Sequence, residues 1–497
     1  MSNVMLCRHG QVQSVVIMKI IRTSAASVVS SGGLSSGAYM TPHEVHLAQP
    51  TARPSDYHHA LSEARRRIIA TDQWAGSQLM GRRWPIGCVA LEITQRCNLD
   101  CTACYLSENS EGVKDIPLEE LFRRIDLIFD HYGPNTNVQV TGGDPTLRKR
   151  EELVAIVRRL SHKGMRASLF TNGIRAKREL LVELVEAGLV DVAFHVDLTQ
   201  ERKGYESEVA LNEIRQDYVE RARGLPLSVM FNATIFDRNF EEIPAIVRFF
   251  VRNCDVVRLA SFQLQAETGR GTLGRRNAAI AVQSVQEQIE KGARSSISFD
   301  ALRVGHARCN RYGMIFVANN RAYDALDDRR LLEAILERMP LLSFDRRSRS
   351  KVTATFMRGV LTSPYLSFKA AGWVVRKAWQ AKADLWAARG RVNKLSFVIH
   401  NFMDACRLER DRVDACAFTA MTQRGPISMC LHNAKRDAFI LAPIRLSGPE
   451  GERFWNPISG ELMEEPAGMQ RPPDPNRRAA KGRLKRAATA AGAAIVG

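Results

Sequence analysis

The sequence predicts an α/β fold made of six consecutive strand–helix units. Short runs rich in Val, Ile, Leu and Phe alternate with longer segments in which apolar residues recur every three or four positions. Such an alternation implies parallel strands joined by right-handed crossovers, arranged as an open sheet or as a barrel. With 497 residues, 45% of them hydrophobic, the chain can bury one large core and a smaller unit beside it.

The strands and helices can be assigned in order. The run CVALEIT at 88–94 is typical of a buried strand, and apolar residues from Leu118 to Phe129 follow it at helical spacing. In a barrel of parallel strands, the catalytic and binding residues lie where the strands end and the loops begin. Further strands are expected at 137–141, 167–171, 190–197, 227–236 and 256–265, with helices at 151–161, 179–187 and 243–251 and a polar helix before 227.

Composition divides the chain into six segments. The early stretch SAASVVSSGGLSSGAY consists of small residues that cannot bury enough apolar surface to offset chain entropy, and the C-terminal stretch is rich in Pro, Arg, Lys and Ala. We expect a disordered N-terminal extension at 1–51, a helical lead-in at 52–84, a core barrel at 85–300, a linking and amphipathic helical region at 301–395, an auxiliary cysteine region at 396–450 and a basic, largely disordered tail at 451–497.

The net charge and the cysteine content say more about the cellular location of the protein than about its binding partner. A net charge of +18 suits a polyanion or an anionic membrane surface but identifies neither. Ten cysteines are far too few for a disulfide-stapled secreted scaffold, which favours a reducing, cytoplasmic location. The apolar run near the N-terminus is interrupted by Lys19, and no apolar stretch approaches the ~18 residues that span a bilayer. We therefore expect neither a cleaved signal nor a transmembrane helix.

Three cysteines follow the first predicted strand in CNLDCTACYL: Cys97, Cys101 and Cys104. Disulfides explain them poorly, because one thiol would stay unpaired and the rings would be strained. Three thiolates can hold three irons of a cubane cluster and leave the fourth iron open to a ligand from outside the protein. A structural zinc site would need a fourth Cys or His, and none lies within the loop. The loop therefore favours an iron–sulfur cluster.

A second motif, TGGDPT at 141–146, follows the second strand. Alone it is weak evidence, because a glycine pair after a strand also makes a tight turn or an anion-binding loop. Polar side chains then close the later strands as well, so one face of the barrel is expected to collect them. They are Thr171, Asn172, Asp197, Asn232, Thr234, Gln263 and Gln265.

The ordered pair of CNLDCTACYL and TGGDPT resembles the radical S-adenosylmethionine (SAM) superfamily, and the resemblance covers about 84–272. It implies a partial (β/α)6 barrel and a 4Fe-4S cluster on Cys97, Cys101 and Cys104. It further implies that SAM binds the open iron and is reductively cleaved to a 5′-deoxyadenosyl radical, which abstracts hydrogen from a substrate. An electron donor such as flavodoxin or ferredoxin is implied as a partner.

The resemblance also implies a SAM-binding set. Asp144 stands where the family more often has Glu, and a shorter carboxylate can accept the same hydrogen bond from the methionyl amino group. Many members have an aromatic residue just before the third cysteine, whereas this chain has Ala103 there and Tyr105 just after Cys104, so the adenine contact stays open at this position. The implied set is Gly142, Gly143, Asp144, Pro145, Thr171, Asn172, Asp197 and Tyr105.

A second group of cysteines lies far downstream: Cys406, Cys416 and Cys430, with Cys309 as a fourth candidate ligand. They would hold an auxiliary iron–sulfur cluster, or they are ordinary buried cysteines that pack as small hydrophobes. Buried cysteines rarely gather in one polar stretch punctuated by Gly and Pro, so we favour the second cluster.

One segment of the linking region is amphipathic and rich in tryptophan. Its apolar face, bordered by Arg376 and Lys377, suits a peripheral membrane contact or a greasy substrate. Packing on the barrel explains the same pattern equally well, so both interpretations stay open. The face contains Phe368, Gly372, Val375, Trp379, Lys382 and Trp386.

Three functional classes remain. Tyr105, the segment HNFMD and the segment PISMCLHN are similar to the tetraether lipid synthase branch, which implies a lipid or other inert C–H substrate. The alternative is a relative of the molybdenum-cofactor cyclase or of the SPASM/twitch peptide-modifying enzymes, with a small-molecule or peptide substrate. A non-catalytic metal-binding protein that holds nucleic acid is the rival from another class. No specific nucleic acid is expected, because a binding module has no need to gather polar residues at successive strand ends.

Overall fold

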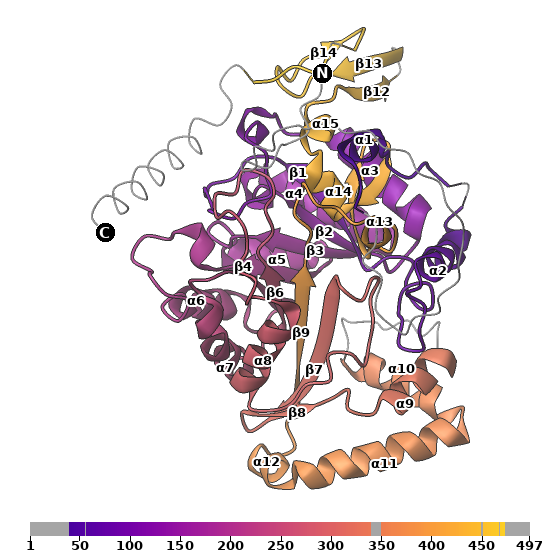
Figure 1. Cartoon of the computed structure of the whole chain (residues 1–497), viewed down its shortest axis with the longest axis vertical. Coiled ribbons are helices and arrows are strands. Elements are labelled where there is room, and N and C mark those ends of the chain that lie inside the picture. Colours follow the sequence, from indigo (N-terminus) through magenta and orange to yellow (C-terminus); the bar gives the residue numbers. More distant parts are fainter. Residues whose placement is uncertain (1–38, 55, 339–348, 449–450, 467, 473–497) are drawn as a thin grey trace, which may run out of the picture.

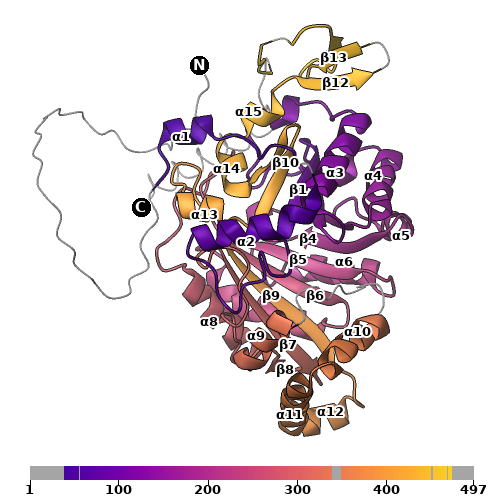
Figure 2. The same cartoon turned by 90° about the vertical axis from the view of Figure 1, so that its right-hand side faces the viewer.

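The fold is an eleven-stranded sheet flanked by helices, in a computed structural model that describes residues 39–54, 56–338, 349–448, 451–466 and 468–472 (Figures 1 and 2). The strand order is β11-β10-β1-β2-β3-β4-β5-β6-β9-β7-β8. Strands β1 to β6 are successive parallel neighbours, which confirms the predicted α/β class. These strands are β1 (Cys88–Thr94), β2 (Asn137–Gly142), β3 (Arg166–Thr171), β4 (Leu189–His195), β5 (Ser228–Ile235) and β6 (Val257–Leu264).

A helix follows each of these strands and covers one face of the sheet. Leu121 and Ile125 of the first helix are buried in the same core as Val89 and Leu91 of β1. Because side chains alternate along a strand, Ala90 and Glu92 of β1 face the other side. The helices are α3 (Leu118–Tyr132), α4 (Arg150–His162), α5 (Arg178–Glu186), α6 (Asn212–Ala222), α7 (Ile243–Arg252) and α8 (Val282–Ala293).

The later strands extend the sheet at both edges. On one edge, β10 (Phe418–Thr422) runs parallel to β1 and β11 (Gly425–Ser428) antiparallel to β10. On the other, β9 (Asn393–Asn401) runs parallel to β6, followed by antiparallel β7 (Asn310–Ala318) and β8 (Arg321–Asp324). The ring of His400, near the end of β9, meets the edge of Phe418 at the start of β10 with centroids 5.0 Å apart. The sheet therefore curls into an open barrel, and within the described strands β1 and β6 do not pair.

The chain before the barrel contains α1 (Pro42–Leu47), η1 (Tyr57–His59) and α2 (Ala60–Ala70). Helix α1 lies inside the segment expected to be disordered up to residue 51. Thr41 and Glu44 form a capping box at its start, and Val45 packs against Leu408 and Leu431. These long-range contacts, which composition does not reveal, order the helix. The rest of the expected extension, residues 1–38, lies outside the described residues.

The chain after the barrel is partly ordered as well. Strands β12 (Ile444–Gly448), β13 (Gly451–Trp455) and β14 (Leu462–Met463) form a separate small sheet. Strands β13 and β14 lie within the region expected to be a tail, and Trp455 of β13 is buried in the main core, which composition does not reveal. The basic end, 473–497, lies outside the described residues. The helices α13 (Arg410–Asp414), α14 (Met429–Ala434) and α15 (Asp437–Ile440) lie beside the strands of this half.

A helical arm comprises α9 (Arg329–Arg338), α10 (Arg349–Leu361), α11 (Pro364–Gln380) and α12 (Lys382–Ala387). Figure 1 shows α11 and α12 at the end of the long axis opposite the small sheet. One face of α11 packs on α9 and α10, and its Trp373 also meets Phe316 of β7 with ring centroids 5.9 Å apart. Among the described helices, none has the length and hydrophobicity of a bilayer-spanning segment.

Candidate functional site

The cysteine loop leaves the carboxyl end of β1 and is held by the ends of the neighbouring strands. The backbone N–H of Thr102 donates to the carbonyl of Thr199, after β4, at 2.8 Å. The side-chain amide of Asn172, after β3, donates to the Oδ1 atom of Asn98 at 2.6 Å. The loop is therefore fixed over the end of the barrel where the sequence predicted the site.

The thiols of Cys97, Cys101 and Cys104 are free and close enough to influence one another's ionisation. Burial raises the pKa of Cys97 to about 12, and the charges of Asp144 and Cys104 act in the same direction. Burial likewise raises the pKa of Cys101, with Cys104 and Cys97 adding to the shift. In the described part of the chain no three His, Cys, Asp or Glu side chains stand at metal-ligand distances from one another. Metal binding here would thus require the thiols to converge and lose their protons.

The segment after β6 covers this loop, a role that the sequence analysis missed. The N–H of Arg270 donates to the carbonyl of Leu106 at 2.7 Å, and its guanidinium to that of Leu99 at 3.3 Å. Gly269 has φ +58°, and a Cβ atom there would lie 2.4 Å from the carbonyl oxygen of Cys104. Although burial opposes its charge, Arg270 has a raised pKa because Cys104 and Glu111 lie beside it. A fixed cation beside a cysteine loop favours the thiolate form that binds metal.

The glycine pair brings the end of β2 against the start of the cysteine loop. A Cβ atom on Gly142 would lie 2.0 Å from the carbonyl oxygen of Thr94, and one on Gly143 2.0 Å from that of Arg96. Gly142 also has φ +130°, which side chains rarely adopt. The turn continues into η3 (Pro145–Leu147), which begins at the predicted Pro145.

Asp144 is buried and its carboxylate joins β2 to β3. It accepts hydrogen bonds from the Thr171 hydroxyl and the Asn172 N–H, both at 2.8 Å, and from the Thr146 N–H at 3.0 Å. The structure thus brings together three residues that the sequence predicted for one site: Asp144, Thr171 and Asn172. It also shows that the carboxylate already has protein partners.

Asp197 closes β4 and forms a buried pair with His195, which the sequence analysis did not single out. The His195 Nε2 atom lies 2.7 Å from the Asp197 carboxylate, which also accepts from the N–H of Thr234 at 2.7 Å. Burial disfavours the Asp197 charge, but His195 and the hydrogen bonds outweigh it and lower the pKa of Asp197 to about 2. Asp197 also acts on the pKa of Cys101, which places it beside the cysteine loop.

The other predicted polar residues are less closely joined to this loop. Asn232 belongs to β5, and its carbonyl accepts from the N–H of Val196 at 3.1 Å. The Gln265 side chain donates to the carbonyl of Gly274 at 2.7 Å, which shapes the segment after β6.

Tyr105 lies between the glycine turn and a buried ion pair from the late part of the chain. Its hydroxyl donates to the carbonyl of Gly142 at 2.6 Å, and the guanidinium of Arg436 lies 4.7 Å from its ring centroid. Arg436 binds both carboxylate oxygens of Glu92 in β1, at 2.8 and 2.7 Å. The sequence offered no signal for this pair, because its members are 344 positions apart.

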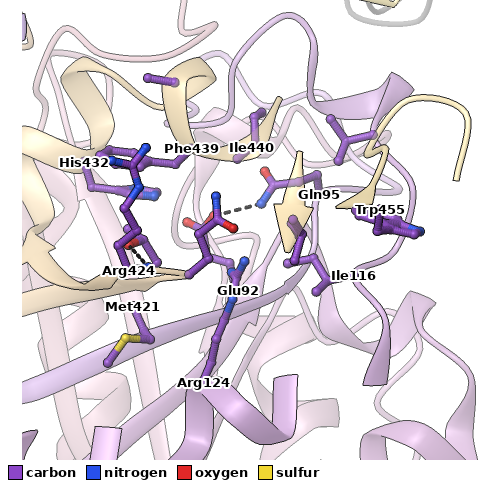
Figure 3. Close-up of a pocket in the computed structure, with 15 residues that line it drawn as sticks. Glu92, Gln95, Ile116, Arg124, Met421, Arg424, His432, Phe439, Ile440 and Trp455 are labelled. Atoms are coloured by element: carbon purple, nitrogen blue, oxygen red, sulfur yellow. Dashed lines mark hydrogen bonds between the residues drawn. The ribbon is translucent and has the colours of Figure 1, made fainter. Parts of the chain in front are cut away.

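A small cavity lies next to this ion pair (Figure 3). Glu92, Gln95, Arg124 and His432 point toward it. The Nδ1 atom of His432 is buried without a hydrogen-bond partner, and burial lowers the pKa of His432 to about 4, so the ring is neutral at pH 7. With about 30 Å³, the cavity has room for one or two waters and not for a substrate.

Three late cysteines come together at another place. Cys309 precedes β7, Cys416 follows α13 and Cys430 lies on α14, and all three are free thiols. Burial raises the pKa of Cys430 to about 12, and Cys416 and Cys309 add to this shift. The guanidinium of Arg412 donates to the Cys309 sulfur at 3.2 Å. Cys406 is disulfide-bonded in the structure and is therefore not among the free thiols of the described residues.

The two thiol groups lie near opposite ends of β1. Cys88, the first residue of β1, is close enough to Cys416 for its pKa to be raised by it, although burial is the larger cause. The cysteine loop begins after Thr94, so the length of β1 separates the groups by roughly 20 Å. Helix α14 carries the chain from Cys430 toward Arg436, which contacts Tyr105.

This arrangement defines an open α/β barrel with a three-thiol loop at its strand ends. Residues 91–250 match the family model described as the radical SAM superfamily. The matched range begins inside β1 and ends inside α7, so it contains both predicted motifs.

Several proteins are similar to this range. A 7,8-dihydro-6-hydroxymethylpterin dimethyltransferase of Methanocaldococcus jannaschii is 30% identical over 186 residues, covering 36% of each chain. A probable GTP 3′,8-cyclase of Pyrococcus abyssi is 31% identical and covers 37% of this chain and 59% of its own length. A PqqA peptide cyclase of Bradyrhizobium diazoefficiens is 29% identical, with 36% and 46% covered. The chain thus matches between about a third and three fifths of the length of these relatives.

A solved structure, Streptococcus suis SuiB bound to S-adenosylmethionine, is 16% identical. It superposes with a TM-score of 0.33 and covers 41% of this chain and 46% of its own.

Proposed function

We propose that the chain is a radical SAM enzyme with its reaction centre at Cys97, Cys101 and Cys104. The observation that carries the proposal is the position of three free thiols over the strand ends, against the glycine turn and beneath Arg270. A 4Fe-4S cluster with SAM would supply one-electron cleavage to a 5′-deoxyadenosyl radical for hydrogen abstraction.

The residues around the thiols fit this cofactor pair. Three thiols without a fourth protein ligand in the loop leave one iron for SAM. The tight approach of Gly142 and Gly143 to the loop leaves their backbone groups free of side-chain bulk beside it. Asp144, Thr171, Asn172 and Asp197 would bind and orient SAM from the ends of β2, β3 and β4, and Tyr105 would fix the turn through Gly142. The segment after β6, which covers the loop, would help to keep water away from a radical.

The substrate class has two supported candidates. The relatives are named for a pterin, for GTP and for a peptide, which favours a small molecule or peptide. The segments HNFMD and PISMCLHN favour a lipid or another substrate with inert C–H bonds. Either substrate requires an external one-electron donor, for which flavodoxin or ferredoxin is the proposed partner. The predicted division of the chain, apart from the ordered helix α1 and the ordered strands β13 and β14, belongs to the same proposal, as does a cytoplasmic location.

Cys309, Cys416 and Cys430 would hold a second iron–sulfur cluster. The support is that three free thiols come from three separate segments, and that, besides burial, the nearby Cys416 raises the pKa of both Cys309 and Cys430. Arg412 would balance their negative charge once they are deprotonated.

The proposal is tested by anaerobic reconstitution with iron and sulfide, reduction, and measurement of 5′-deoxyadenosine formed from SAM. Wild-type protein should form it, and the variant Cys97→Ala, Cys101→Ala, Cys104→Ala should not. Cys254→Ala is the matched control, because Cys254 is a buried thiol just beyond α7. Wild-type turnover in the triple variant would refute the proposal.

A further inference from the structure

Helix α11 has two apolar faces on opposite sides, and only one is covered. Leu366 is fully buried, and Ala370 and Trp373 pack beside it against Leu331 and Val360 of the arm. This inner face gives α11 its place on α9 and α10. A helix that is held by one face would ordinarily present a polar face to water.

The outer face of α11 is apolar and exposed instead. Phe368 is 80% exposed and Trp379 72% exposed, and Trp386 of α12 is 87% exposed. Phe368 lies two positions after Leu366, so it is turned about 200° around the helix from the inner face. Exposing apolar side chains of this size to water costs free energy, and a row of them marks an interaction surface. The row, which we call the outer stripe, consists of Tyr365, Phe368, Val375 and Trp379 of α11 and Trp386 of α12.

The surface around the outer stripe is positive. Asp384 is the one acidic residue between 354 and 392, and it is buried, with hydrogen bonds to Tyr323 and Asn319 of the body. The Lys382 ammonium lies 3.9 Å from the Trp379 ring centroid. Arg376 is partly balanced by Asp327, at 3.3 Å. The exposed basic residues of this surface are Arg358, Lys369, Arg376, Lys382, Arg389 and Arg391.

We propose that the outer stripe docks the protein on an anionic lipid surface. Trp and Tyr rings prefer the boundary between hydrocarbon and headgroups, and Lys and Arg can bury their stems while the charges reach lipid phosphates. Each basic residue near an anionic leaflet adds to the attraction. Figures 1 and 2 show α11 at one extremity of the molecule, where a flat surface can approach it without meeting the barrel.

A second copy of the chain fits this surface less well. A two-fold contact through the outer stripe would bring two basic surfaces together, with no exposed acid between 354 and 392 to pair with them. An anionic membrane supplies the charge that such a dimer lacks.

The test is co-sedimentation of the full chain with phosphatidylcholine vesicles, with and without phosphatidylglycerol. Wild-type protein should bind the anionic vesicles and be released by salt. The variant Phe368→Ser, Trp379→Ser, Trp386→Ser should bind at least about tenfold more weakly. Ile69→Ser with Val209→Ser is the matched control, because both residues are exposed and lie outside the arm.

A second set of variants tests the contribution of the basic residues separately from that of the apolar outer stripe. Lys369→Glu, Lys382→Glu, Arg389→Glu should lose binding to anionic vesicles, whereas Arg252→Glu, Lys291→Glu, Arg294→Glu, elsewhere on the exposed surface, should keep most of it. Equal binding by the outer-stripe variant and its control would overturn the proposal. So would wild-type protein that ignores vesicles but forms a dimer, by light scattering, that the outer-stripe variant cannot form.

Discussion

Asp144 shows how one side chain can serve both the fold and the proposed cofactor site. Its carboxylate holds the Thr171 hydroxyl and the Asn172 N–H, so the ends of β2 and β3 keep one relative position. A carboxylate with several protein donors is rigid. Any hydrogen bond that it offers to SAM would therefore come from a fixed point.

Asp144→Ala should lower the free energy of unfolding by about 1–3 kcal/mol, because it leaves buried donors without an acceptor. It should also weaken SAM binding by about 1.5–3 kcal/mol if the carboxylate meets the methionyl amino group. Denaturant unfolding of the protein without iron measures the first effect, and calorimetry with SAM on the reconstituted protein measures the second. Unchanged SAM affinity would remove Asp144 from the binding set.

The buried ion pair of Glu92 and Arg436 predicts how the stability of the protein depends on pH. Burial alone would raise the pKa of Glu92, but Arg436 and His432 outweigh it and lower that pKa from 4.5 to about 2. A depressed pKa contributes stability that is fully present above pH 4.5 and is lost as the pH falls toward 2. In Arg436→Ala the carboxylate stays buried without its cation, at a cost of about 3–5 kcal/mol.

The measurement is urea unfolding of cluster-free protein at several pH values from 6 down to 4. Wild-type protein should lose stability as the pH falls, whereas Arg436→Ala should regain part of its loss, because protonation neutralises Glu92. Parallel pH profiles in the two proteins would contradict this account of the pair.

Among the residues of the candidate site, the sequence predicted those that lie close together along the chain. Cys97, Cys101 and Cys104 share one loop, and the glycine turn is a local motif, so spacing alone identified both. Arg270 and Arg436 reach the same loop from distant segments. Their contacts depend on how the barrel folds, and one sequence carries no local signal for them.

At the scale of elements, the loop between β6 and α8 acts as a cover for the cysteine loop. Gly269→Ala would place a methyl group against the Cys104 carbonyl and should displace this cover. We expect less iron after reconstitution, with the secondary structure unchanged by circular dichroism. Gly274→Ala is a close control: Gly274 has a similar φ of +68° but no atom within 4 Å of the added Cβ. If both variants lose iron equally, backbone strain rather than the contact is the cause.

The central strands could be predicted because each is marked by a short run of mostly apolar residues that are consecutive in the sequence. CVALEIT is apolar apart from Glu92 and Thr94 and is fully buried as β1, since helices cover one side and the barrel interior the other. Strands β9 and β10, which extend the sheet beyond β6 and β1, were not predicted as parts of it. Their pairing with β6 and β1 joins segments more than a hundred residues apart, and hydrophobic periodicity says nothing about such partners.

At the scale of the whole molecule, the curl of the sheet creates the second thiol group. The end of β9 meets the start of β10, and this contact brings Cys309 beside Cys416 and Cys430. The sequence analysis grouped all four late cysteines, but in the structure Cys406 is disulfide-bonded whereas the other three are free thiols. Chain spacing could not distinguish them, because Cys309 is remote in sequence and Cys406 is near.

The iron content of the protein tests this grouping. The variant Cys309→Ala, Cys416→Ala, Cys430→Ala should hold clearly less iron than wild-type protein, because the thiols of the second site are gone. It should still cleave SAM, since β1 separates the sites by roughly 20 Å. Cys406→Ala should keep wild-type iron content, which makes it the matched control. If the triple variant keeps the full iron content and an unchanged paramagnetic resonance spectrum, the three cysteines only pack between β9 and β10.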